Sequence, residues 1–398
     1  MRIEKGVAAA LVMTLALGSG ALAQTDTSAN PTLEHFRAYR AALAHDDMAT
    51  AEREASAALA ASIARDGDGG VTAVLAINLA QARLALGRTG EAYEPAQRAF
   101  AITASGRSNI DPLLARLVLG RAELTDDHWR QGANRLEAAL QETVTHPELN
   151  GDTYSAAADL GRWYYTQDQY EGAQSAWDIA KRMADAAGQG NDYARAEARM
   201  GHAAAVFVQA MAATITAQAR PTDTHIGGNA DAAFDAADQE LVEAQNILGP
   251  YAYTPSADGG LTQGQRVYAS AEAWRRLLRA FANSRGLRGL AARHPSFDVP
   301  QPDGRPTCDV DVITEPKPTF PPGAEAGFTV GAVVLRLRVD EGGRLVDSQV
   351  AAAVPGRSFR EAVERVTPQW RIERAASSAP NCRYSPIVFF SATFEFSR

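Results

Sequence analysis

The chain has 398 residues, of which 46% are apolar and 22% are charged. This composition predicts folded domains with apolar cores, and the length leaves room for two or three of them. The formal net charge of −8 excludes the concentrated basic surface that nucleic-acid binding requires, so we expect no nucleic-acid partner.

The first 23 residues have the pattern of a secretory signal peptide. Two basic residues, Arg2 and Lys5, precede an apolar run over 7–17, and a small-x-small cleavage site ends at Ala23. The run is too short to span a bilayer, which takes roughly 20 apolar residues. We expect cleavage, export to the periplasm of a Gram-negative bacterium and no membrane span in the mature chain. The alternative is an uncleaved segment that keeps the protein at the inner membrane.

Residues 32–293 are rich in helix-forming residues and show no two-residue alternation, which predicts an all-helical domain. An apolar residue followed by a small one recurs every 40 or 41 residues. These pairs begin at Leu79, Leu119, Leu160 and Met200. In the first three copies another small residue follows at a constant distance, at positions Ala92, Gly132 and Ala173.

This spacing resembles the tetratricopeptide repeat, in which two antiparallel helices pack through small residues. The best copy covers 154–180, and a weaker one fits Tyr39, Ala51, Ala55 and Ala58. The period exceeds the usual length of about 34 residues, which indicates longer helices or linkers. The resemblance implies a solenoid with a concave groove suited to a peptide or protein ligand.

The last predicted helix, about 263–293, carries seven arginines. One interpretation is a surface for an anionic partner, and the other is a capping helix whose arginines are solvated. Charge runs usually mark exposed faces, which favours the capping interpretation. The arginines are Arg266, Arg275, Arg276, Arg279, Arg285, Arg288 and Arg293.

A proline-rich linker at 294–306 ends the helical region, and the periodicity then changes. In the C-terminal domain, 307–398, two-residue alternation predicts a strand near 333–339 that turns into a second at 344–352. A short helix follows at 358–366, and alternation returns at 387–396. The sequence therefore predicts a small α+β domain with the order strand, strand, helix, strand, and with the helix covering one face of the sheet.

The ordered motifs of this domain are similar to those of the TonB C-terminal domain family. They are Phe320-Pro-Pro, Val339-Asp-Glu-Gly-Gly-Arg-Leu and Trp370-Arg-Ile. The resemblance implies that the last strand adds an extended segment of an outer-membrane receptor, or of another envelope protein, by β-augmentation. The partner-binding residues that it implies are Ile387, Phe389, Ser391 and Thr393, with Arg336 and Arg338 beside them.

The chain departs from the TonB pattern, because a long proline- and lysine-rich spacer is not evident in it. We therefore keep two hypotheses for a multidomain, non-enzymatic periplasmic protein. The first is TonB-dependent transport or energy transduction through receptor binding. The second is a soluble tetratricopeptide scaffold for protein–protein interaction without energy transduction, in which the last strand is only a protected sheet edge.

The two cysteines, Cys308 and Cys382, are expected to pair because an oxidising periplasm favours disulfides. The alternative is two buried free thiols. Common catalytic motifs are not evident, and none of the seven histidines has the spacing of a metal ligand to another. We therefore predict no enzyme activity, no catalytic or metal-binding residues and no cofactor.

Overall fold

The computed structural model describes residues 30–125, 127–188, 190–219, 226–256, 259–286, 290, 293–296, 304–321 and 330–395. The signal peptide predicted at 1–23 lies outside them. Among the described residues, one compact unit holds 30–167 and 175–188, and the other holds 168–174 and the residues from 190 onward. This division differs from the boundary predicted at the proline-rich linker, because the last long helices group with the strands.

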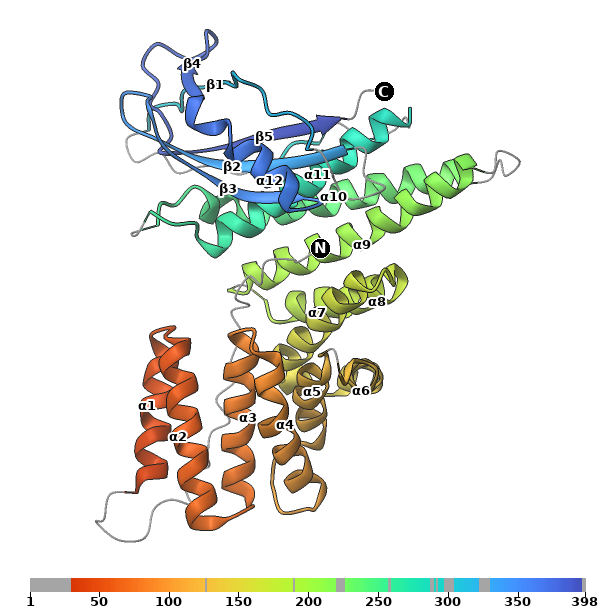
Figure 1. Cartoon of the computed structure of the whole chain (residues 1–398), viewed down its shortest axis with the longest axis vertical. Helices are drawn as coiled ribbons and strands as arrows, with labels where there is room; N and C mark the ends of the chain where they lie inside the picture. Colours follow the sequence, from red (N-terminus) through yellow and green to blue (C-terminus); the bar gives the residue numbers. More distant parts are fainter. Residues whose placement is uncertain are drawn as a thin grey trace. The chain divides into compact units, whose positions relative to one another are not determined.

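The first unit is a series of antiparallel helices (Figure 1). Short turns join successive helices, and Asn30, Asp47 and Asp111 accept backbone N–H groups at three of the helix starts. The helices are α1 (Pro31–Ala44), α2 (Met48–Asp66), α3 (Gly70–Ala85), α4 (Thr89–Ala104), α5 (Pro112–Glu123), α6 (Trp129–Glu142), α7 (Asn150–Thr166) and, from residue 175 onward, α8 (Tyr170–Ala186), with 3₁₀ turns at Thr143–Thr145 and Pro147–Leu149.

Small residues let the paired helices approach closely, as the repeat pattern predicts. A methyl group added at Gly120 of α5 would lie 2.7 Å from Cδ2 of Leu136 in α6. One added at Gly161 of α7 would lie 2.8 Å from the Trp177 ring in α8. Ala92 and the other small residues at this position are buried as well. The coarse prediction of a helical-repeat region is confirmed by these pairs.

The second unit begins with three long helices, α9 (Asp192–Ala219), α10 (Ile226–Ala252) and α11 (Gln263–Ser284). Aromatic rings from all three meet in one cluster, in which Phe207 contacts Phe234, Trp274 and Phe281. A Thr262–Gln265 capping box starts α11. No helix in the described part of the chain is long and apolar enough to cross a bilayer.

Four of the arginines predicted for the last helix differ from both interpretations of the sequence, whereas Arg266 is exposed and Arg288 lies outside the described residues. Arg275 and Arg279 of α11 donate to Asp238 of α10, whose side chain is fully buried, and Arg293 lies 3.8 Å from the same carboxylate. Arg276 pairs with Glu272 one turn earlier. Because α11 lies between α10 and the strands, these arginines neutralise buried or neighbouring acids rather than forming one solvated face.

The strands form two antiparallel sheets. The larger has the order β3-β2-β5, from β2 (Val330–Val339), β3 (Leu345–Val354) and β5 (Ile387–Glu395). Helix α12 (Arg357–Glu364) and a 3₁₀ turn (Thr367–Gln369) follow β3, so the predicted order of strand, strand, helix, strand is present. A second sheet, which the sequence did not predict, pairs β1 (Val310–Ile313) with β4 (Arg371–Arg374).

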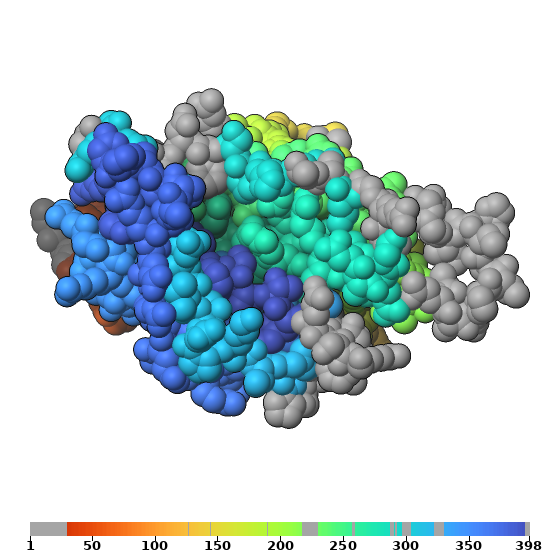
Figure 2. All heavy atoms as spheres, turned by 90° about the horizontal axis from the view of Figure 1, so that it is seen from above, coloured from red at the N-terminus to blue at the C-terminus, as the bar shows by residue number. Residues whose placement is uncertain are grey.

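Both faces of the larger sheet are covered. The apolar face packs on Phe359 and Val363 of α12 and on Trp370. The opposite face packs on α11, and the indigo atoms of β5 lie against the turquoise atoms of that helix in Figure 2. Because β2 is central and covered on both sides, every residue of it except Arg338 is buried.

Cys308 and Cys382 form a disulfide across 74 residues, which confirms the predicted pairing. Backbone hydrogen bonds support the same junction, because the Cys308 N–H donates to the Arg383 carbonyl at 2.8 Å. The disulfide and this hydrogen bond together connect the start of the C-terminal domain to the segment that leads into β5.

Candidate functional site

Most of the side chains expected to form a partner-binding face on β5 make contacts within the chain. Ile387 is only 1% exposed. The Phe389 ring packs 5.0 Å from the ring of Tyr268 and 5.5 Å from that of Tyr253. Ser391 donates a hydrogen bond to Glu272 of α11 at 3.2 Å. Thr393 is exposed.

Arg336 is also used inside the chain. Its side chain is 1% exposed and crosses from β2 to the segment between α10 and α11. It donates to the carbonyl oxygens of Gly260 and Gly259 at 2.6 and 2.7 Å, and Asp347 lies 3.4 Å away. A face that holds the sheet to α11 is not free for a partner, so the expected role of Ile387, Phe389, Ser391 and Arg336 side chains in recognition needs correction.

The main chain of β5 has N–H and C=O groups that are accessible to a partner strand. The Val339 N–H donates to the Pro386 carbonyl, so these two residues form a hydrogen-bonded pair of the antiparallel ladder. The hydrogen-bonded pairs then recur at every second residue, beginning with Leu337 and Val388. The N–H and C=O groups of Phe389, Ser391 and Thr393 therefore point away from β2. Within the described part of the chain, β5 pairs with β2 alone, so these groups line an open edge.

The open edge of β5 begins after Ile387, because the Ser385 side chain already bonds the backbone of that residue. The outward C=O of Ile387 accepts a hydrogen bond from the Ser385 hydroxyl at 2.7 Å, and the Ile387 N–H donates back to that oxygen at 3.4 Å. A pairing strand would therefore start at Phe389. The sequence analysis proposed Phe389, Ser391 and Thr393 for their side chains, whereas the antiparallel register shows that their backbone groups are the accessible part.

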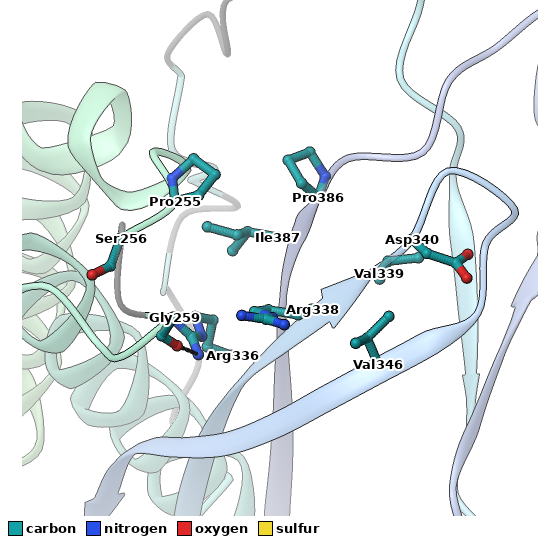
Figure 3. Close-up of a pocket in the computed structure, with 10 residues that line it drawn as sticks. All are labelled: Pro255, Ser256, Gly259, Arg336, Arg338, Val339, Asp340, Val346, Pro386 and Ile387. Atoms are coloured by element: carbon teal, nitrogen blue, oxygen red, sulfur yellow. Dashed lines mark hydrogen bonds between the residues drawn. The ribbon is translucent and has the colours of Figure 1, made fainter.

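A pocket of about 310 Å³ opens where β2 ends and β5 begins (Figure 3). The guanidinium groups of Arg336 and Arg338 lie near one another beside Gly259, and Asp340 stands at the far end, next to the hairpin turn. Asp340 accepts the N–H groups of Gly342 and Arg344 in that turn. The lining residues are Pro255, Ser256, Gly259, Arg336, Arg338, Val339, Asp340, Val346, Pro386 and Ile387.

The helical repeats carry a second candidate surface, made of partly exposed aromatic rings. The rings of Trp129 and Trp163 stack at 5.0 Å, and those of Tyr93 and His128 stack at 4.6 Å. The guanidinium of Arg130 lies 4.7 Å above Trp129. Trp, Tyr and Arg are the residues that dominate binding energy in protein interfaces. The sequence analysis missed this cluster, because its members come from three separate helices and a loop.

Two further sets of ionisable side chains lie among the described residues. Burial raises the pKa of Tyr268 and that of Tyr253, so both hydroxyls stay protonated at neutral pH. Asp111, His146 and Glu148 bring three potential ligand atoms within 4.8 Å of one another, although their spacing along the chain did not predict a metal site. His146 lies 2.9 Å from Glu148 and 3.7 Å from Asp111, and exposed ion pairs account for these contacts.

Comparison with known proteins identifies no family. No family model matches the chain, and no curated protein matches it. Among solved structures, a TPR repeats protein from Bacteroides fragilis is 14% identical, with 61% of this chain and 99% of that chain covered. The TM-score is 0.26, which is too low to support an argument about fold or function. The description of the repeats therefore rests on the helix pairs themselves.

Proposed function

We propose that the chain is a non-enzymatic interaction scaffold of the Gram-negative cell envelope, and that its C-terminal domain is TonB-like. In this proposal the domain binds an extended segment of an outer-membrane receptor, or of another envelope protein, by strand addition to β5. The signal-like pattern at 1–23 supports a periplasmic location, and the order of β2, β3, α12 and β5 supports the TonB-like assignment.

The observation that carries strand addition is the open edge formed by Phe389, Ser391 and Thr393. Each residue offers one donor and one acceptor, and a net hydrogen bond contributes about 0.5–1.5 kcal/mol. The side chains of Phe389 and Ser391 are held against the α10–α11 region, so the strand is rigid before a partner arrives. Recognition through main-chain groups tolerates varied partner sequences, which suits a module that serves several receptors.

The helical repeats support the second hypothesis, a scaffold without energy transduction. The stacked rings of Trp129 and Trp163, with Arg130 above them, have the composition of an interface centre. The two functions are compatible in one chain, because the rings and the β5 edge lie in different compact units. They differ in what the C-terminal domain must bind.

A proline at position 393 tests the edge directly. Thr393→Pro removes an outward N–H without touching the ladder to β2, and proline is tolerated at such edge positions. Thr393→Val, the matched control, keeps the N–H. The immobilised full chain would be exposed to solubilised outer membranes, and captured proteins would be identified by mass spectrometry. We expect the control to capture β-barrel receptors and the proline variant to bind them at least about tenfold more weakly.

Three outcomes separate the hypotheses. Equal capture by Thr393→Pro and by the wild type would rule out strand addition at β5. Loss of capture on Trp129→Ala and Trp163→Ala, with no effect of the proline, would assign binding to the repeats instead. N-terminal sequencing of the exported protein tests the location, and a retained membrane-anchored N-terminus would favour energy transduction over a free scaffold.

A further inference from the structure

We propose that the pocket beside Arg338 binds one carboxylate group that is attached to a small apolar group. The pocket lies on the α11-facing side of the sheet, whereas the backbone groups of β5 that would pair with a partner strand point outward from the edge of the sheet. The inference therefore does not depend on strand addition, and it rests on the charge and the walls of the pocket.

Among the described residues at the pocket, Arg338 is the guanidinium that has no close carboxylate partner. Arg336 is neutralised by Asp347 at 3.4 Å, and its donors reach two carbonyl oxygens. Asp340 keeps its negative charge at the far end of the pocket, where its carboxylate accepts the N–H groups of Gly342 and Arg344 in the hairpin turn. Arg338 has no ion pair within 4 Å among the described residues, and its side chain is half-buried at the pocket. One guanidinium without a close acid among the described residues, with the Asp340 carboxylate at the far end, favours a singly charged anion over a phosphate dianion.

The geometry of Arg338 suits a carboxylate in particular. A guanidinium presents parallel N–H donors that match the two oxygens of a carboxylate, and charged hydrogen bonds of this kind are shorter and stronger than neutral ones. Arg338 faces Ile387 across the ladder, at a pair whose side chains stand close together. The strand pairing thus fixes the backbone of Arg338 at the pocket, and its Nη1 lies beside Gly259, 2.6 Å from where a methyl group on that residue would stand.

The walls define the remainder of the ligand. They are apolar on several sides, and the volume of about 310 Å³ is at the lower end for small-molecule sites. A branched alkyl group of four or five carbons would be buried there while its carboxylate meets Arg338. Two sources supply this chemistry, namely a free branched-chain acid and the C-terminal leucine or valine of a polypeptide. The apolar wall residues are Pro255, Val339, Val346, Pro386 and Ile387.

Titration calorimetry on the full chain tests the proposal with three probes. These are 4-methylpentanoate, the peptide Gly-Gly-Leu with a free carboxyl end, and the same peptide as its amide. We expect at least one of the acids to bind and the amide not to bind. Arg338→Gln should weaken binding of the acid at least about tenfold, because it removes the charged hydrogen bonds. Arg344→Gln, the matched control, removes an exposed arginine of the same hairpin and should leave affinity unchanged.

A second variant tests the pocket independently, in case Arg338→Gln does not fold. Val346 lines the pocket and is 56% exposed, so Val346→Glu should not disturb the fold, while its carboxylate repels the ligand. Thermal melting of each variant would confirm this. Binding by 4-methylpentanoate alone would identify a free acid as the ligand, and binding by the peptide alone would identify a polypeptide end.

Several results would overturn the proposal. They are the absence of binding by either acid, equal binding of the amide, equal weakening by Arg344→Gln, and competition by inorganic phosphate at the same concentration as the acid. Arg338→Gln should also leave receptor capture unchanged in the experiment with Thr393→Pro. The pocket and the β5 edge can therefore fail independently.

Discussion

Replacing Asp238 with asparagine should loosen α11 from α10, because it removes the charge that three arginines share. The Asp238 side chain is fully buried. It accepts from Arg275 at 3.0 Å and from Arg279 at 2.7 Å, with Arg293 3.8 Å away. An asparagine of nearly the same size preserves the packing but not the negative charge, so the substitution isolates the electrostatic contribution.

The size of the effect follows from which arginines can return to water. Removing one partner of a buried ion pair typically costs about 3–5 kcal/mol. Arg279 and Arg293 are about one quarter exposed and can be partly solvated, whereas Arg275 is only 7% exposed and cannot. We therefore expect a loss near the lower end, about 3 kcal/mol. This corresponds to a roughly 150-fold increase in local opening.

Hydrogen exchange with mass spectrometry would measure that opening peptide by peptide. Peptides from α10 and α11 should exchange faster in Asp238→Asn, while those from α3 and α4 should not change. Asp178→Asn is the matched control, since Asp178 also faces two cations, Lys181 and Arg182, but is half exposed. It should cost at most about 0.5 kcal/mol. If both variants behave alike, the buried charge cluster does not hold α11 in place.

Two further predictions concern the disulfide and a buried acid. Replacing both Cys308 and Cys382 by serine should lower the free energy of unfolding of the C-terminal domain by about 4 kcal/mol, because the bond closes a 74-residue separation. Urea titration measures this: the variant should unfold earlier than the wild type without reductant and like it in reductant, and identical curves without reductant would contradict the prediction. Burial raises the pKa of Asp152 despite the nearby Arg121 and the Gln81 amide, so the folded state binds a proton more readily than the unfolded state. Wild-type stability should therefore rise as pH falls through the raised pKa, and Asp152→Asn should be more stable than wild type at pH 7 by a margin that shrinks in acid. Thermal melting of both proteins at pH 7 and in acid checks this, and a variant that is less stable than wild type at pH 7 would contradict it.

The helical repeats were predictable because their signal is local and periodic. Small residues at Gly120 and Gly161 recur where the second helix of each pair crosses the first, so spacing alone identified the contact. The pairing of Cys308 with Cys382 followed from the expected compartment and the number of cysteines. The strands of the C-terminal domain followed from two-residue alternation and from the glycine turn between β2 and β3.

The residues of the chain that pack against each surface could not be predicted in the same way, because they are distant in the sequence. Ser391 meets Glu272 across 119 residues, and Arg279 meets Asp238 across 41. A run of arginines has the same pattern whether water or a buried aspartate faces it. The β1–β4 sheet was missed for a related reason, since its strands have only four residues each and show too little alternation to distinguish them from loops.

The sequence by itself determined the local elements of this protein, because helix and strand periods, turn glycines and small contact residues are properties of short segments. Tertiary structure alone decided what those elements do. It placed α11 over the face of β5 that the sequence offered for binding, and it turned the backbone of Phe389, Ser391 and Thr393 toward the open edge. It also placed Arg338 in a pocket, without a close acidic partner among the residues that the structure describes. These outcomes depend on contacts between distant residues, which short-range patterns do not encode.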